Sequence, residues 1–213
     1  MSFNSLNYFR INSTIPGIKD NDDFQAVLKL PVKPVFVLYG DILTIPDIVR
    51  KLKEHGKTVF VNIDLIEGFS SKEIVVKFLK TTTQIDGILS SKANMIRAAG
   101  NLGLITIHRF FLIDSFSYSN LFKQIEISKP DCIEMMPGCM PTVISWVVEK
   151  TDIPVIAGGL VCNADDAQAA LNAGACAVSS TNRIVWSWQP AHLTGIRKPN
   201  KSRRVILKDL TET

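Results

Sequence analysis

The sequence predicts an α/β fold, a closed (β/α)8 barrel of the TIM-barrel class. Short apolar, β-branched segments alternate with amphipathic segments of helical period, and eight such pairs fit between about residues 14 and 188. Uninterrupted apolar strands flanked by helices are typical of a parallel sheet that is buried on both faces. Eight units close into a barrel, whereas five or six favour an open sheet. The shortness of the first strand leaves the open sheet as the alternative.

Turn and cap residues place the elements in the first half of the chain. Pro46 stands at a tolerated early helical position, and Gly56 ends that helix. Ser70 or Ser71 caps the next helix, with Glu73 in its first turn. The strands are expected at 14–18, 35–42, 58–66 and 87–90, and the helices at 20–30, 46–54, 70–79 and 93–99.

The second half repeats the pattern and ends in two neighbouring polar turns. Asn163 caps a helix that Gly174 ends. That helix stands between a strand ending in Gly158-Gly159 and a strand followed by Ser179-Ser180-Thr181-Asn182. The strands are expected at 104–113, 132–136, 155–157 and 175–178, and the other helices at 118–127, 141–149 and 183–188.

Composition narrows the classes of protein. The 213 residues are 46% apolar, which suffices for one large core. No stretch approaches the roughly 20 apolar residues of a membrane span, and the first residues lack the pattern of a signal peptide, so we expect a cytoplasmic protein with no membrane partner. The four cysteines are expected to be reduced, and no His or Cys pair has metal-ligand spacing. We therefore expect no metal and no cofactor.

The net charge of +4 comes from the end of the chain. Residues 1–188 hold equal numbers of basic and acidic residues, while 189–213 are rich in Lys and Arg. We expect residues 1–188 to form one ligand-sensing barrel domain, and 189–213 to form a basic, mobile tail. Affinity for nucleic acid must then come from a local patch or from the tail.

Ligands of such barrels bind at the carboxyl ends of the strands, where the predicted site residues fall. The turns with Gly158 and Gly159 and with Ser180, Thr181 and Asn182 offer the backbone N–H groups and hydroxyls that a phosphate needs. Lys19, Lys92 and Arg109 are the candidate cations. The alternative is that both segments are only tight turns and that the cations are solvated.

Three charged residues interrupt apolar strands and would contact the hydroxyls of a polyol. They are Asp64, Arg109 and Glu134. Buried charges need partners, so the alternative is an ion pair of Asp64 or Glu134 with Arg109. His108 lies beside Arg109, points the opposite way in a regular strand, and is interpreted as structural.

The chain resembles the glycerol-3-phosphate-responsive antiterminators, which regulate glycerol metabolism in bacteria. The resemblance spans about residues 13–188 and rests most specifically on DLIEG (64–68), RFFLIDS (109–115) and EMMPGCMP (134–141), in this order. It implies a sensor of glycerol 3-phosphate that binds leader mRNA of glycerol genes and prevents transcription termination. The family usually has Arg where Lys19 stands, and Lys lacks the bidentate fork of Arg.

Two other function classes stay open, and the RNA-binding surface is not fixed. A barrel enzyme (isomerase, lyase or synthase) acting on a small phosphorylated sugar could use Asp64 and Glu134 as acid and base, although we predict no catalytic residues. A protein-interaction module is the third class, and a homo-oligomer is left open. Basic positions on the predicted helices are candidate RNA contacts, alongside the tail: Lys51, Lys53, Lys57, Lys77, Lys80 and Lys123.

Overall fold

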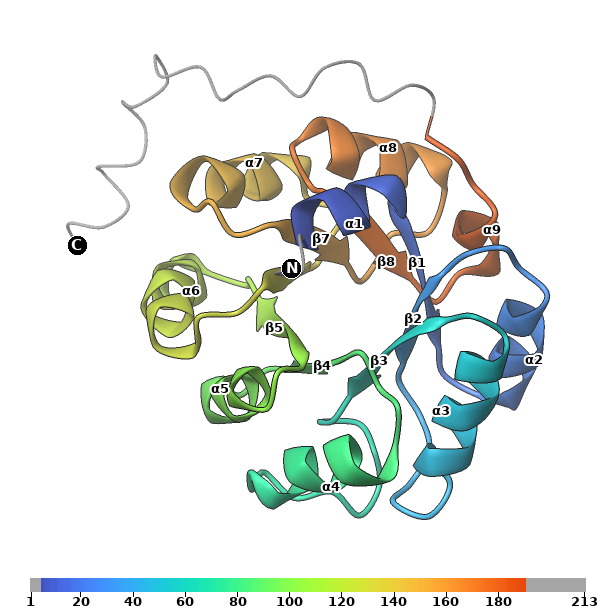
Figure 1. The fold of residues 1–213 in the computed structure, drawn as a ribbon. Coiled ribbons are helices and arrows are strands. Elements are labelled where there is room, and N and C mark those ends of the chain that lie inside the picture. Colours follow the sequence, from blue (N-terminus) through green and yellow to red (C-terminus); the bar gives the residue numbers. More distant parts are fainter. Residues whose placement is uncertain (1–4, 191–213) are drawn as a thin grey trace.

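The computed structural model describes residues 5–190, and these residues form a closed barrel of eight parallel strands in sequence order, as predicted (Figure 1). Helices ring the outside, and β1 pairs with both β2 and β8 to close the sheet. The strands are β1 Thr14–Ile18, β2 Pro34–Val37, β3 Thr58–Asn62, β4 Gly87–Ser90, β5 Ile105–Phe111, β6 Cys132–Met136, β7 Val155–Gly158 and β8 Ala177–Ser180. The helices are α1 Ser5–Ile11, α2 Asn21–Leu28, α3 Ile45–Glu54, α4 Ile74–Thr82, α5 Ala93–Asn101, α6 Ser115–Ser128, α7 Pro141–Lys150, α8 Ala164–Asn172 and α9 Arg183–Trp186.

Strands β2, β3 and β5 end earlier than the sequence predicts, and β8 lies two residues later than predicted, at Ala177–Ser180. The apolar runs through Ile42 and Ile66 continue into the loops after β2 and β3, where Ile66 packs in the core although it is not in a strand. An isolated bridge between Asp41 and Glu67 joins these two loops. The apolar run therefore predicted the burial of Ile66 correctly, but it predicted a strand where the structure has a loop.

Two helix starts also differ from the prediction. Helix α4 begins at Ile74, with Glu73 rather than Ser70 or Ser71 at its N-cap. Helix α6 begins three residues before the predicted Tyr118, because Asp114 accepts from the Ser117 backbone N–H and forms a capping box. The predicted cap of α8 is confirmed, since the Asn163 side chain accepts from the backbone N–H of Asp166.

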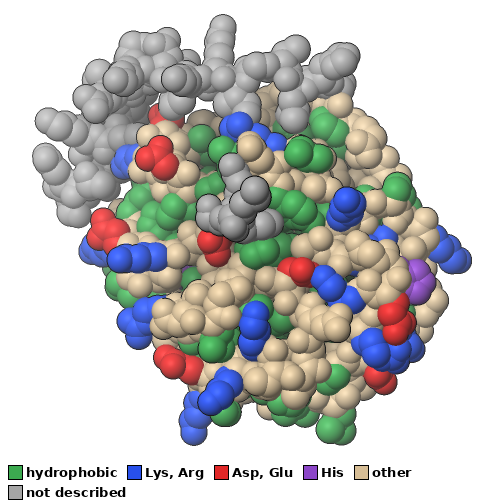
Figure 2. Space-filling model, in the orientation of Figure 1, with side chains coloured by type: hydrophobic (Ala, Val, Ile, Leu, Met, Phe, Trp, Pro, Cys, Tyr) green, Lys and Arg blue, Asp and Glu red, His purple; other side chains and the backbone are tan. Residues whose placement is uncertain are grey.

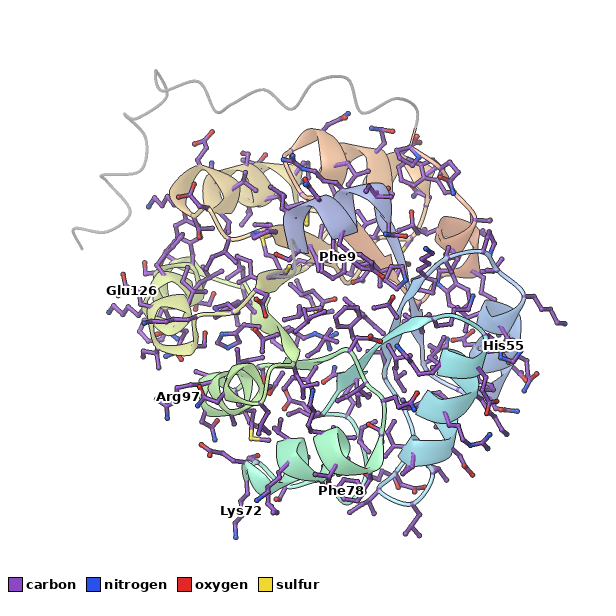
Figure 3. The ribbon with its side chains drawn as sticks, in the orientation of Figure 1. Phe9, His55, Lys72, Phe78, Arg97 and Glu126 are labelled. Carbon is purple, nitrogen blue, oxygen red and sulfur yellow. The ribbon has the colours of Figure 1, made fainter. Side chains whose placement is uncertain are left out.

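Helix α1 is the element that the prediction missed, and it closes one end of the barrel. Phe9 is fully buried and lies against Phe60, with ring centroids 5.7 Å apart (Figure 3). The Ser5 hydroxyl donates to the Asp131 carbonyl, just before β6, at 3.1 Å. Helix α1 therefore covers the amino-terminal ends of the strands and leaves the carboxyl ends open for a ligand.

The barrel interior is filled by large side chains. Phe36, Phe60, Leu89 and Ile107 are almost fully buried in one cluster with Phe9. Gly87 is required beside them, since a Cβ there would lie 2.2 Å from the Ile105 carbonyl oxygen. The interior is thus a packed core and not a channel.

The prediction of a basic tail at 189–213 falls almost wholly outside the described residues. Within residues 5–190, no helix is long and apolar enough to cross a membrane.

Candidate functional site

A cavity of about 360 Å³ opens at the carboxyl ends of the strands. Most of the predicted site residues line it, namely Arg109, Glu134, Gly159, Ser180, Thr181 and Asn182. Lys19, Asp64 and Gly158 do not line it. The cavity also has apolar walls. Met136, which the sequence predicts as core and pocket wall, lines it, and so do five residues that the sequence analysis did not identify: Phe36, Leu38, Leu65, Leu160 and Val161. Because these five side chains look like ordinary core residues in sequence, no local signal marked them.

The turn after β7 is unusual in its backbone conformation. Gly159 and Leu160 follow one another with φ values of 70° and 57°. A left-handed conformation is ordinary for Gly but uncommon for Leu, whose side chain is also 68% exposed. The Gly159 carbonyl accepts from the backbone N–H of Gly138 at 2.8 Å, which joins this turn to the loop after β6.

Gly158 supports the wall of the cavity. A Cβ at Gly158 would lie 2.5 Å from both the Glu134 Oε1 and the Ser179 Oγ atoms. Only glycine therefore allows β7 to pass this close to the Glu134 carboxylate.

The turn after β8 is tied to the turn after β7. The Ser180 hydroxyl donates to the Val161 carbonyl at 2.6 Å. Asn182 donates from Nδ2 to the Cys162 carbonyl and accepts the Ile184 backbone N–H, which caps α9. No group in residues 5–190 forms a hydrogen bond with the exposed Thr181 hydroxyl. The two turns thus form one connected rim that includes the exposed Thr181.

Arg109 and Glu134 form a buried ion pair at the base of the cavity. Arg109 Nε lies 2.5 Å from Glu134 Oε2, and Ser179 donates to Oε1 at 2.6 Å. The Glu134 side chain is only 1% exposed and that of Arg109 10%. Both carboxylate oxygens are therefore engaged, as the ion-pair alternative expected. Within the described chain, Nη1 and Nη2 of Arg109 have no hydrogen-bond acceptor, so they remain available to a ligand.

Asp64 is engaged outside the cavity. Its carboxylate accepts from the Ser90 hydroxyl and from the backbone N–H and hydroxyl of Ser91, and lies 3.4 Å from Lys92 Nζ. Burial raises the pKa of Asp64, but the hydrogen bonds from Ser91 and Ser90 and the charge of Lys92 bring it below its ordinary value. The Asp64 carboxylate and the Lys92 ammonium group therefore serve as each other's ionic partner.

The remaining predicted residues lie apart from the cavity. Lys19 is exposed just beyond β1, where its backbone N–H donates to Asp23. His108 is buried, and its Nδ1 lies 2.9 Å from the Ser128 hydroxyl, which agrees with the structural interpretation. No group of three or more His, Cys, Asp or Glu side chains in residues 5–190 could hold a metal ion.

The fold and this cavity define a TIM barrel with a small, partly polar pocket at the carboxyl ends of β7 and β8. The sequence profile of the glycerol-3-phosphate responsive antiterminators matches residues 14–186, almost the whole barrel. The chain therefore belongs to the glycerol-3-phosphate responsive antiterminator family.

Individual relatives agree with this assignment. The chain is 50% identical over 182 residues to the protein YgcP of Escherichia coli strain K12, which covers 85% of this chain and 95% of YgcP. It is similar to the glycerol uptake operon antiterminator regulatory protein of Listeria monocytogenes, with 31% identity, a TM-score of 0.81, and coverage of 83% of this chain and 96% of that one. A related protein of Thermotoga maritima matches with 30% identity, a TM-score of 0.73, and coverage of 83% and 99%.

Barrel enzymes share only the fold. A deoxyribose phosphate aldolase of Aeropyrum pernix has a TM-score of 0.66 but 11% identity, over 83% of this chain and 89% of that one. A common fold at this level of identity does not define activity.

Proposed function

We propose that this protein is a transcription antiterminator that binds glycerol 3-phosphate in the cavity and, in the liganded form, binds the leader mRNA of glycerol-metabolism genes. Family membership supports the metabolite and the regulatory class. The observation that carries the proposal is the cavity itself, with its connected rim and with the unpaired Nη groups of Arg109 at its base.

The phosphate is proposed to bind between the two turns. Thr181 offers a hydroxyl there, and the backbone of Gly159 and of Thr181 lines the cavity beside it. Helix α9 begins directly after Asn182, whose side chain already accepts the Ile184 N–H, so the phosphate contacts are expected from the two turns and not from the helix start. Ser180 and Asn182 hold this geometry through their bonds to the loop after β7.

The glycerol hydroxyls are proposed to contact Arg109 at the base of the cavity. Glu134 fixes the guanidinium orientation through Nε, which leaves two Nη groups to donate to hydroxyl or phosphate oxygens. Ligand contacts by Asp64 and Lys19 remain predictions, and the structure does not favour them. The Asp64 carboxylate already pairs with Lys92 and accepts hydrogen bonds from Ser90 and Ser91, and Lys19 lies outside the cavity.

Isothermal titration calorimetry of the purified protein with glycerol 3-phosphate tests the ligand. A Thr181→Asp variant places a carboxylate beside the proposed phosphate, and we expect at least about tenfold weaker binding, about 1.4 kcal/mol. The matched control is Thr142→Asp, at an exposed threonine outside the cavity. Equal loss of affinity in both variants, or in neither, would contradict the proposed phosphate position.

The regulatory step needs a second experiment. A gel shift with the leader transcript of the glycerol-uptake genes of the same organism should show tighter binding when glycerol 3-phosphate is present. Product analysis after incubation separates this function from the enzyme alternative, since a sensor releases glycerol 3-phosphate unchanged. RNA binding that ignores the metabolite, or turnover of the metabolite, would overturn the proposal.

A further inference from the structure

The two ends of the barrel differ in charge, although residues 5–190 carry equal numbers of basic and acidic side chains. Exposed acids prevail around the carboxyl ends of the strands, where the cavity opens: Asp20, Asp22, Glu67, Glu73, Asp114 and Asp165. Exposed cations prevail at the opposite end: Lys29, Lys33, Lys51, Lys80, Arg97 and Lys129. Figure 2 shows that opposite face, with Lys and Arg side chains around its rim and Asp and Glu side chains among them. A polyanion is therefore attracted to the face away from the metabolite.

A groove on this basic face combines the groups that a nucleotide needs. It has a volume of about 650 Å³ and lies between the ends of α5 and α6. Arg97 and Lys129 line it, and Arg97 projects from the outer side of α5 (Figure 3). Asn101 adds an amide, and Ile127, which is 53% exposed, adds an apolar surface. Cations suit the phosphates of RNA, and the amide and apolar groups suit an unstacked base.

The acid in the groove lining is already engaged. Asp131 Oδ2 accepts from the backbone N–H and the hydroxyl of Thr106, both at 2.8 Å. One carboxylate oxygen of Asp131 is thus held by β5, and Arg97 and Lys129 form no ion pair within the described residues.

Two of the lysines that the sequence suggested as RNA contacts are otherwise occupied. Lys57 is buried and donates to the Leu30 and Val32 carbonyls. Lys53 lies 2.6 Å from Asp86 in an ion pair. The groove cations are better placed than these two for an RNA contact.

The groove and the metabolite cavity share strand β5 and lie at opposite ends of β6. Thr106 lines the groove and Arg109 lines the cavity, three residues further along β5, or about 10 Å at 3.3 Å per residue. Asp131, just before β6, accepts from Thr106, and Glu134 in β6 pairs with Arg109. A ligand that repositions Arg109 therefore acts on β5, whose other end lines the groove.

We infer that leader RNA binds the amino-terminal face of the barrel at the groove of Arg97 and Lys129, opposite the metabolite pocket. This inference rests on the proposed function and deepens it by naming the RNA surface. The acidic rim of the cavity, by contrast, repels a phosphodiester backbone.

The test compares charge reversals on the two faces in the full-length protein. Arg97→Glu and Lys129→Glu are measured for leader-RNA affinity at several salt concentrations with saturating glycerol 3-phosphate. The matched control is Lys72→Glu, an exposed lysine just before α4 on the cavity side. We expect each groove variant to bind RNA at least about tenfold more weakly and to lower the salt slope by about 1, while the control stays near wild type.

Each variant is also measured by calorimetry with glycerol 3-phosphate. This distinguishes a failure of the proposed RNA surface from a failure of the proposed function. Unchanged metabolite affinity in the groove variants, together with weaker RNA binding, supports the inference. If wild-type RNA binding responds to the metabolite but Lys72→Glu weakens it as much as the groove variants do, the surface is wrong and the function stands. If the wild-type protein binds no leader RNA, both fail.

Discussion

Glu134 is the residue on which the geometry of the cavity depends. It is buried, it fixes Arg109, and Gly158 must lack a side chain to leave room for it. The sequence marked these positions because a charge or a glycine interrupted an apolar strand. It could not show that Glu134 pairs with Arg109 while Asp64 pairs with Lys92, because those choices depend on packing between strands distant in the chain.

Replacing Arg109 should destabilise the protein strongly. Arg109→Met leaves the Glu134 carboxylate buried with only Ser179 as a partner, at an expected cost of about 3–5 kcal/mol in urea unfolding. Adding Glu134→Gln to this variant removes the unpaired charge and should recover much of the loss. A single variant as stable as wild type would contradict the buried pair.

Gly158 should tolerate no larger side chain. Gly158→Ala forces a contact with Glu134 and Ser179, and we expect a loss of about 1–3 kcal/mol in the free energy of unfolding. Gly100→Ala is the matched control in α5, where a Cβ meets only one atom, at 3.9 Å, and a gain of about 0.5–1 kcal/mol is expected. The opposite order of stabilities would disprove the close approach at Gly158.

His108 gives the stability a specific pH dependence. Burial lowers the pKa of His108 to about 4, although the Ser91 carbonyl and Asp64 favour its charged form. The unfolded chain binds this proton near pH 6.5 and the folded chain only near pH 4, so stability falls as the pH drops through that window. The expected loss is about 3 kcal/mol in total.

Urea unfolding of the wild type and of His108→Gln between pH 7 and pH 4 measures this effect. The wild type should lose stability more steeply, because the variant has no imidazole to protonate. Parallel curves would show that His108 titrates normally in the folded protein.

At the scale of elements, the alternation of apolar strands and helices was sufficient to predict the barrel. Strands β1, β4 and β6 match their predicted bounds, because polar or glycine residues stand directly at their ends. Strands β2 and β3 were predicted too long, because their loops stay apolar where they pack on the barrel. Helix α1 was missed because Phe9 is its one fully buried residue, which leaves little helical period to detect.

Helix α1 should contribute to stability through that one residue. Phe9→Ala empties a fully buried site against Phe60, and we expect a loss of about 3–5 kcal/mol in thermal or urea unfolding. Ile11→Ala, on the same helix but 83% exposed, should change stability by less than about 0.5 kcal/mol. Similar effects of the two substitutions would mean that α1 does not close the barrel.

At the scale of the whole molecule, the barrel separates two surfaces of opposite charge. The acidic end carries the cavity proposed for the metabolite, and the basic end carries the groove of Arg97 and Lys129. The net charge of the barrel residues is zero, and it concealed this separation in the sequence. Composition does not show at which end of the barrel each charged residue lies. Strands β5 and β6 reach both ends, which gives a physical route for coupling between the two surfaces.

A crystal structure with bound glycerol 3-phosphate tests the central claim most directly. We predict phosphate density between the turns of Gly159-Leu160 and Ser180-Thr181-Asn182, with the Arg109 Nη groups directed to the ligand. A metabolite bound elsewhere on the protein, or a cavity that stays closed to it at saturating concentration, would contradict the account.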